Sequence, residues 1–281
     1  MNTIKLKKLL QQLFIEDIGE RDITSETIFL PDDNSCGHFL VKEDGVVCGL
    51  PIIKEGYQLF DPSIEVTFYK KDGDYVKAGE VIAKACGPII YLLSGERVIL
   101  NLVQRMSGIA TMTHRTVERL NSKHTRICDT RKTTPGLRML EKYAVRCGGG
   151  FNHRLGLYDG VLIKDNHIAY AGSITKAVQK VREQLGHMVK VEVEIESKEE
   201  LREAIEANVD VILLDNCSPD QIKEFVSCVP KSIVTEASGG ITLENIAEYR
   251  DTGVDYISLG MLTHSIRALD ISFNIIGGKK G

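Results

Sequence analysis

Three features that mark other protein classes are missing from this 281-residue sequence. No stretch approaches the roughly eighteen consecutive apolar residues of a transmembrane helix, so we expect no membrane span. The N-terminus, MNTIKLKKLLQQLF, lacks the continuous apolar core and the cleavage site of a secretory signal. Its apolar residues instead have the spacing of an amphipathic helix. No Gly-x-Gly-x-x-Gly follows a predicted strand, which removes the usual argument for dinucleotide binding.

The cysteines exclude a further group of proteins. There are seven, an odd number, and none form a Cys-x-x-Cys pair. Several lie within apolar runs, so we expect reduced, mostly buried thiols and neither a disulfide framework nor a zinc site. Reduced thiols and the missing secretory signal together predict a cytoplasmic protein.

The charge is small but unevenly spread. A net charge of -4 and a pI near 6.0 argue against nucleic-acid binding. The segment from Arg131 to His167, however, contains seven Lys or Arg residues and only three acids. It therefore carries a net charge of +4, and the remainder of the chain carries -8. Concentrated positive charge of this kind suits a small, multiply anionic ligand.

The N-terminal part of the chain is predicted to be structural. Residues 37–92 contain short strands with frequent Gly, Pro and Asp, which indicates a compact β-rich module. Gly95 then opens a long predicted helix with Arg97 in its first turn, where a cation opposes the helix dipole. A ligand or a partner chain would explain that position, although an ordinary surface arginine is the simpler alternative.

From residue 126 onward, predicted strands alternate with helices. Ser197-x-x-Glu200 and Ser218-Pro-x-Gln221 match the capping-box pattern, and Thr242 is expected to cap a further helix. Repeated alternation indicates a parallel sheet with right-handed crossovers, and six strands favour an α/β barrel over a doubly wound sheet. The predicted strands cover residues 126–129, 160–164, 189–194, 209–215, 232–238 and 254–260.

Charged residues and glycines follow these strands, at the edge where barrel enzymes hold their functional groups. They are Arg131 and Lys132, Lys164, Glu194, Asp215, Ser238-Gly239-Gly240, and Gly260. One charged residue at a strand end is usually just where the chain meets water. Six strand ends in register instead predict a single binding mouth.

The residue types suggest how that mouth is divided. Arginines, with His153 and Arg154 nearby, suit bidentate binding of carboxylates. Glycine-rich loops after the last two strands suit a phosphate, helped by the helix expected at Thr242. Glu194 and Asp215 suit sugar hydroxyls or Mg²⁺. An activated phosphorylated sugar and an acidic small molecule would satisfy all three regions.

These motifs closely resemble the quinolinate phosphoribosyltransferase family. The resemblance runs from about Glu16 to Phe273. It implies an N-terminal open-faced β-sandwich over residues 1–104, with the tail 270–281 packed back on it, and an incomplete α/β (TIM-like) barrel over residues 105–269. The matching segments are 95–97, 107–110, 130–136, 153–154, 164–167, 192–194, 214–216, 236–242 and 258–264.

The resemblance also implies a function and roles for single residues. The expected enzyme converts quinolinate and phosphoribosyl pyrophosphate to nicotinate mononucleotide, pyrophosphate and CO2, with Mg²⁺, in NAD synthesis, as a homodimer. Arg131, His153 and Arg154, with Arg97 of the partner subunit, would bind quinolinate. Lys132, Lys164, Glu194 and Asp215 would be catalytic and would bind phosphoribosyl pyrophosphate, Glu194 and Asp215 also serving the metal. Ser238, Gly239, Gly260 and His264 would line the 5-phosphate pocket.

Three alternatives remain open at this point. A paralogue in molybdenum-uptake operons shares the architecture and has a different acceptor. Its segment corresponding to residues 164–167 lacks the lysine and the aspartate, so Lys164 and Asp165 favour quinolinate. A Schiff-base aldolase could use Lys164 as its amine. A non-catalytic sensor of phosphoribosyl ligands would bind without turnover.

Overall fold

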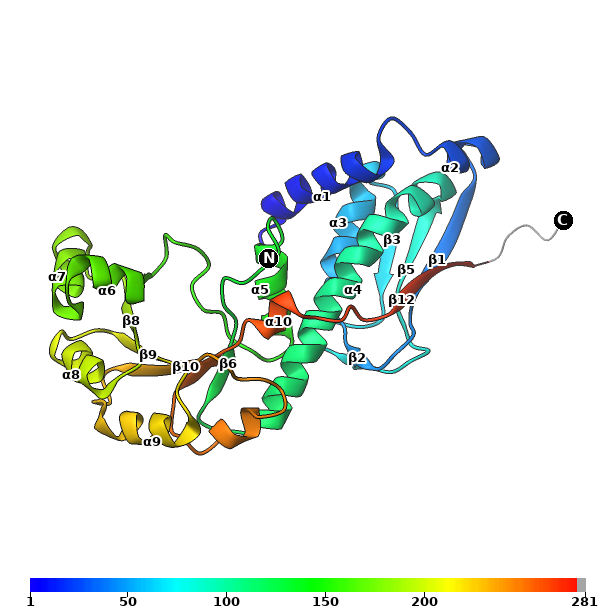
Figure 1. Cartoon of the computed structure of the whole chain (residues 1–281). Coiled ribbons are helices and arrows are strands. Elements are labelled where there is room, and N and C mark those ends of the chain that lie inside the picture. Colours follow the sequence, from blue (N-terminus) through cyan, green and yellow to red (C-terminus); the bar gives the residue numbers. More distant parts are fainter. Residues whose placement is uncertain (277–281) are drawn as a thin grey trace. The chain divides into compact units, whose positions relative to one another are not determined.

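The computed structural model describes residues 1–276 and divides into two compact units (Figure 1). The first contains residues 1–114, 139–149 and the C-terminal segment from Ile266, and the second contains residues 115–138 and 150–265. The domain boundaries at 104 and 269 stay a prediction. Residues 277–281 of the predicted tail lie outside the described residues.

The first unit is built on a four-stranded antiparallel sheet in the order β12-β1-β5-β3. Its helices are α1 (Thr3–Ile18), α2 (Ile23–Ile28), α3 (Leu50–Phe60), the greater part of α4 (Ile89–Leu120) and α5 (Arg138–Cys147). Its strands are β1 (Asn34–Val41), β3 (Glu65–Phe68), β5 (Val81–Pro88) and β12 (Ile271–Ile276), with a separate β2 (Gly45–Val46) and β4 (Tyr75–Val76) pair.

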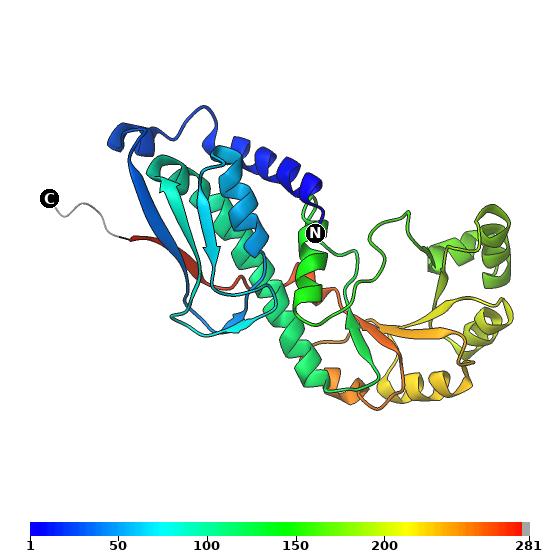
Figure 2. The ribbon, with the colours of Figure 1, turned by 180° about the vertical axis from the view of Figure 1, so that it is seen from behind.

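Among residues 1–276, helices cover one face of this sheet and leave the other open. Buried residues alternate with more exposed ones along β1, as expected when one face meets a core. On the covered face, the ring of Phe39 lies 4.7 Å from that of Phe273 and 6.3 Å from that of Tyr57 on α3. Figure 2 views the chain from behind and shows the strands in front of α4. The predicted open-faced architecture is confirmed.

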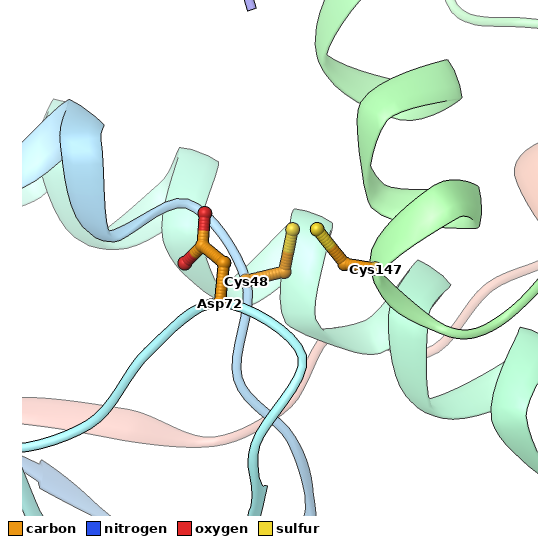
Figure 3. A group of neighbouring side chains, drawn as sticks. All are labelled: Cys48, Asp72 and Cys147. Atoms are coloured by element: carbon orange, nitrogen blue, oxygen red, sulfur yellow. The ribbon is translucent and has the colours of Figure 1, made fainter.

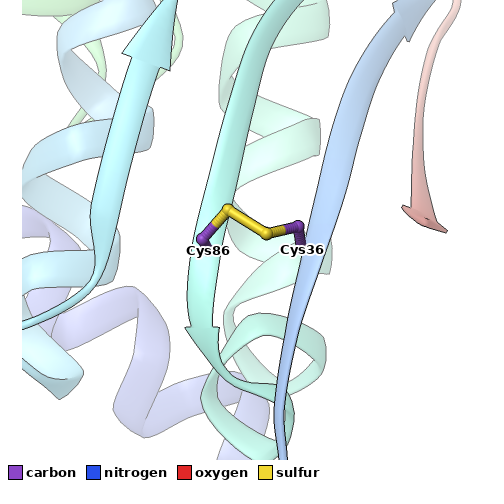
Figure 4. The surroundings of a disulfide bond; sticks show 2 residues. All are labelled: Cys36 and Cys86. Carbon is purple, nitrogen blue, oxygen red and sulfur yellow. A yellow bond between two sulfur atoms is a disulfide. The ribbon is translucent and has the colours of Figure 1, made fainter. Parts of the chain in front are cut away.

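The expectation that all cysteines are reduced is wrong. Cys36 of β1 and Cys86 of β5 face each other in the antiparallel register and form a disulfide (Figure 4). Cys48, Cys128, Cys147, Cys217 and Cys228 form no disulfide. The pairing depends on the register of two strands 50 residues apart, which the spacing of cysteines in the sequence does not reveal.

Two expectations about helices in this unit also need correction. Helix α4 begins at Ile89, directly after β5, so exposed Arg97 lies in its interior and the dipole argument for Arg97 fails. Helix α3 was not predicted, because its start at Gly49 has no side-chain cap of its own. No helix among residues 1–276 is both long and apolar enough to span a membrane.

The second unit holds a six-stranded parallel sheet in the order β6-β11-β10-β9-β8-β7, with β6 and β7 at its two edges. The sheet is therefore not closed, which confirms the incomplete barrel. The strands are β6 (Arg126–Cys128), β7 (Val161–Ile163), β8 (Val191–Ile195), β9 (Val211–Asp215), β10 (Val234–Ser238) and β11 (Tyr256–Ser258).

Local sequence signals explain most of the helices here, which are α6 (Asp165–Ala171), α7 (Ile174–Gln184), α8 (Lys198–Glu206), α9 (Pro219–Cys228) and α10 (Met261–His264). The capping boxes of Ser197 and Ser218 are both present, as predicted. The helix expected at Thr242 is absent. The Thr242 N–H donates to the side chain of Asn245, but only a short 3₁₀ helix, η1 (Ile246–Tyr249), follows.

Candidate active site

The carboxyl ends of the parallel strands open into one cavity of about 600 Å³. All predicted site residues of the second unit line it, whereas Arg97 belongs to the first unit. The register explains the convergence, because β8, β9 and β10 run parallel and end at the same edge. The predicted residues in its wall are Arg131, Lys132, His153, Arg154, Lys164, Glu194, Asp215, Ser238, Gly239, Gly260 and His264.

One part of the wall is strongly cationic. The Arg154 guanidinium donates to the carbonyl of Gly160 at 2.9 Å, which fixes the side chain. Burial, and then the positive charge of Arg131, lower the pKa of Arg154. Arg131 and Arg154 repel each other inside the cavity, so an anion bound between them would be stabilised. Arg138, the third cation of the basic segment, is not in the wall and donates to the Thr133 hydroxyl at 3.0 Å.

His153 faces buried carboxylates behind this cationic wall. Its Nδ1 accepts from the backbone N–H of Arg154 at 2.8 Å, so Nε2 carries the ring proton. Nε2 lies 2.9 Å from Glu192 and 3.5 Å from Glu236. Asp129, at the end of β6, accepts from the His153 backbone N–H at 2.9 Å. The chain thus positions His153 through both its ring and its backbone.

Glu192 and Glu236 were not among the predicted site residues. One carboxylate oxygen of each is buried with no hydrogen-bond partner among the described residues. Burial, and then the charge of Glu192, raise the pKa of Glu236 to about 7. The sequence did hold a signal, since side chains two residues apart on a strand share a face. Glu192 therefore faces the same way as Glu194, and Glu236 the same way as Ser238.

Lys132 is fixed by the segment that follows β11. The Thr263 hydroxyl donates to the Lys132 carbonyl at 2.6 Å. A Cβ at position 260 would come within 2.7 Å of the Lys132 side chain and 3.0 Å of His264. Gly260 therefore leaves the space that the side chains of Lys132 and His264 occupy.

Lys164 and two acids form another part of the wall. The Lys164 ammonium makes an ion pair with Glu194, whose side chain is 13% exposed against 47% for Lys164. Burial, and then the charge of Glu194, raise the pKa of Asp215. The carboxylates of Glu194 and Asp215, on adjacent strands, therefore repel each other, and a bound cation would reduce this repulsion.

The loop after β10 needs its glycines. Gly239 and Gly240 have φ values of +85° and +64°, which residues with side chains rarely adopt. A Cβ on Gly239 would also lie 2.2 Å from the Asn216 side chain, whereas one on Gly240 would meet nothing within 4 Å. Without a helix at Thr242, backbone N–H groups and not a helix dipole are what this loop offers an anion.

Comparison with known proteins agrees with this geometry. Two family models match, the quinolinate phosphoribosyl transferase N-terminal domain over residues 22–107 and its C-terminal domain over residues 109–274. A Bacillus subtilis protein named probable nicotinate-nucleotide pyrophosphorylase [carboxylating] is 58% identical over 98% of this chain and 95% of its own. A quinolinate phosphoribosyltransferase [decarboxylating] from Nicotiana glauca is 41% identical over 97% and 83%.

Solved structures show the same likeness over both units. NadC from Streptococcus pyogenes has a TM-score of 0.94 at 39% identity and covers 99% of this chain and 97% of its own. The nicotinate-nucleotide pyrophosphorylase from Francisella tularensis has a TM-score of 0.93 at 38% identity, with 98% of each chain covered.

Proposed function

The chain belongs to the quinolinate phosphoribosyltransferase family, and from this we propose the reaction performed in its cavity. It is a phosphoribosyltransferase of de novo NAD synthesis. Quinolinate and phosphoribosyl pyrophosphate give nicotinate mononucleotide, pyrophosphate and CO2. The observation that carries the proposal is a single cavity with arginines in one part of its wall and paired acids, lysines and a glycine loop elsewhere.

The division of the cavity between the substrates follows from its charges. We assign the carboxylates of quinolinate to Arg131 and Arg154, whose mutual repulsion an anion would relieve. Both ring nitrogens of His153 already have partners within the protein, Nδ1 in the backbone N–H of Arg154 and Nε2 in Glu192. We assign His153 to quinolinate only because its side chain lines the cavity. Ser238, Gly239, Gly260 and His264 are assigned to the 5-phosphate.

The reaction needs positioning and charge neutralisation more than a nucleophilic side chain. The pyridine nitrogen attacks the ribose carbon as the pyrophosphate leaves, and the charge on the pyrophosphate is neutralised by Lys132 and Lys164. The ring nitrogen is then cationic and stabilises the electron pair that stays on the ring carbon when the 2-carboxylate departs as CO2. A proton replaces that carboxylate on the ring. Holding both substrates in one cavity can lower the barrier by several kcal/mol.

The acids of the wall fit a magnesium ion. Mg²⁺ prefers oxygen ligands and commonly binds through one or two carboxylates together with substrate phosphates. Glu194 and Asp215 supply such oxygens, and a cation would favour the ionised form of Asp215, whose pKa is raised by burial and then by the charge of Glu194. We propose that these two residues hold the ion. When bound, it would neutralise charge on the pyrophosphate.

The homodimer with a shared arginine remains a proposal. It is supported by the exposure of Arg97 on α4 and by the absence of Arg97 from the cavity wall within its own chain. A cytoplasmic location is also proposed, and the five free cysteines agree with it. The Cys36–Cys86 disulfide argues the other way, so fractionation of cells is the test.

The direct experiment is incubation with quinolinate, phosphoribosyl pyrophosphate and Mg²⁺, with detection of nicotinate mononucleotide and CO2. Nicotinic acid in place of quinolinate is the control and should give no product. A Schiff-base lysine reacts as a neutral amine, whereas Lys164 is paired with Glu194. Borohydride trapping of a carbonyl substrate on Lys164 would contradict the proposal, as would substrate binding without turnover.

A further inference from the structure

Two cysteines meet in the first unit, and neither lines the cavity described above. Cys48 lies between β2 and α3 and is fully buried, whereas Cys147 ends α5 and is half-buried. Their sulfur atoms and one oxygen of Asp72 lie within 4.8 Å of one another. Figure 3 shows the two sulfurs facing each other. From this geometry we propose that Cys147 is a peroxide-reactive thiol which Cys48 resolves as a disulfide.

Helix α4 holds the two cysteines together. The Cys48 N–H donates to the Ser107 hydroxyl at 2.9 Å, and that hydroxyl donates back to the Cys48 carbonyl at 3.2 Å. A Cβ on Gly148 would come within 2.4 Å of the Ala110 carbonyl. The residue after Cys147 is therefore pressed against the same helix about one turn further on. The approach of the two thiols is built into the packing of both segments.

The environment divides the roles of the thiols. A hydrogen bond from Cys48 is the main cause that lowers the pKa of Cys147, and burial and the charge of Asp72 only partly oppose it. Burial is the main cause that raises the pKa of Cys48. Of the two thiols, the more accessible Cys147 therefore loses its proton more readily, and burial disfavours the thiolate of Cys48. This division is typical of an attacking and a resolving cysteine.

Asp72 argues against a metal site as the alternative use of this cluster. One of its oxygens accepts from the backbone N–H groups of Gly49 and Leu50 at 3.0 and 2.9 Å, which caps the N-terminus of α3. The other accepts from the Tyr143 hydroxyl at 2.8 Å. The Asp72 carboxylate thus already accepts three hydrogen bonds. A metal ion at this cluster would therefore have the two thiols as ligands and no available carboxylate as the third.

The chemistry balances with hydrogen peroxide as the oxidant. The Cys147 thiolate attacks one peroxide oxygen, the S–O bond forms as the O–O bond breaks, and the hydroxide released takes up a proton. The Cys48 sulfur then attacks the sulfur of the Cys147 sulfenic acid. The S–S bond forms, the S–O bond breaks, and the proton of Cys48 leaves with the hydroxide as water. Two thiols are oxidised, and one peroxide is reduced to two waters.

The test is to treat the full-length protein with hydrogen peroxide, block remaining thiols with an alkylating agent, and map non-reduced peptides by mass spectrometry. We expect a peptide linking Cys48 to Cys147 and loss of two of the five free thiols. Cys48→Ala should leave a sulfenic acid on Cys147 that dimedone captures, and Cys147→Ser should prevent both products. Cys228→Ser, which removes an exposed thiol, is the matched control and should link normally.

Three outcomes would overturn the proposal. One is oxidation of Cys228 while Cys48 and Cys147 stay reduced. A second is a Cys147 that forms no dimedone adduct in Cys48→Ala, with circular dichroism showing that this variant is folded. The third is one equivalent of zinc that survives dialysis and protects both thiols from alkylation, which would assign the pair to a metal.

Discussion

The Nε2 nitrogen of His153 lies 2.9 Å from the carboxylate of Glu192, and both side chains are largely withdrawn from solvent. Nδ1 accepts a backbone N–H, so Nε2 is the ring nitrogen that donates to Glu192. Burial and, second, the charge of Glu192 raise the pKa of Glu236, and the charge interaction with His153 only partly opposes them. The ionised form of Glu236 therefore has an electrostatic cost in the folded chain.

That cost predicts how stability depends on pH. The pKa of Glu236 is about 7 in the folded chain against an ordinary 4.5, so folding favours its protonated form. Glu236 thus becomes increasingly destabilising as pH rises from 4.5 to 7. Glu236→Gln cannot ionise, so it should flatten this dependence and raise the free energy of unfolding above pH 7 by up to roughly 3 kcal/mol.

Urea unfolding of both proteins from pH 5 to pH 8 measures the difference. Glu248→Gln replaces an exposed carboxylate on η1 and should change neither the stability nor its slope with pH. Parallel curves for the wild type and Glu236→Gln would show that Glu236 is already ionised in the folded protein throughout this range.

The cationic wall predicts a selective binding defect. Arg154→Ala removes a guanidinium assigned to a quinolinate carboxylate, and a hydrogen bond to a charged group contributes about 1.5–3 kcal/mol. The KM for quinolinate should rise by roughly ten- to a hundredfold, while the KM for phosphoribosyl pyrophosphate changes by less than about threefold. Arg202→Ala, on the exposed surface of α8, is the control. Equal weakening of both substrates would refute the division of the cavity.

Much of this cavity could be predicted from the sequence, because parallel strands deliver their carboxyl ends to one edge. A correct assignment of the strands was enough to predict that Lys164, Glu194 and Asp215 line the cavity. The helix predicted at Thr242 was wrong even though the Asn245 side chain accepts the Thr242 N–H, a bond that also occurs at helix starts. A cap signal marks where a helix can begin, and whether the helix continues depends on the residues that follow.

Other features depend on partners far away in the sequence. The N-terminus of α3 is capped by the side chain of Asp72, which accepts from the backbone N–H groups of Gly49 and Leu50. Asp72 lies 23 and 22 residues further along the chain than these two donors. Helix α4, which contains Arg97, begins at Ile89 directly after Pro88. Proline is not a typical N-cap residue, so the sequence did not indicate that the helix begins there. Such contacts become visible only once the chain is folded.

The glycine pair after β10 offers a matched comparison. Gly240→Ala meets open space, so it should cost only the strain of a positive φ, about 1–2 kcal/mol of stability. Gly239→Ala has the same strain and would also displace Asn216, which adjoins Asp215. We expect the KM for phosphoribosyl pyrophosphate to rise at least about tenfold in Gly239→Ala and little in Gly240→Ala. Identical kinetics in the two variants would remove the loop from the substrate site.

Sharing of Arg97 between subunits predicts complementation. A heterodimer of Arg97→Ala and Lys164→Ala subunits would contain one intact and one doubly defective site. Purified heterodimers should therefore have about half of the wild-type activity, whereas each mutant homodimer is nearly inactive. Size-exclusion chromatography must first show a dimer. Inactive heterodimers would place Arg97 in the function of its own chain only.

The disulfide between β1 and β5 predicts a stability that depends on redox conditions. It joins residues 50 apart, and the entropy of closing such a loop in the unfolded chain corresponds to about 4 kcal/mol. Cys36→Ser, or treatment of the wild type with dithiothreitol, should lower the free energy of unfolding by roughly 2–4 kcal/mol. Dithiothreitol should have no further effect on Cys36→Ser, and Cys228→Ser should respond as the wild type does. An unchanged stability after verified reduction would mean that strand pairing and the packing of Phe39 already hold this sheet, with the bond contributing nothing to folding.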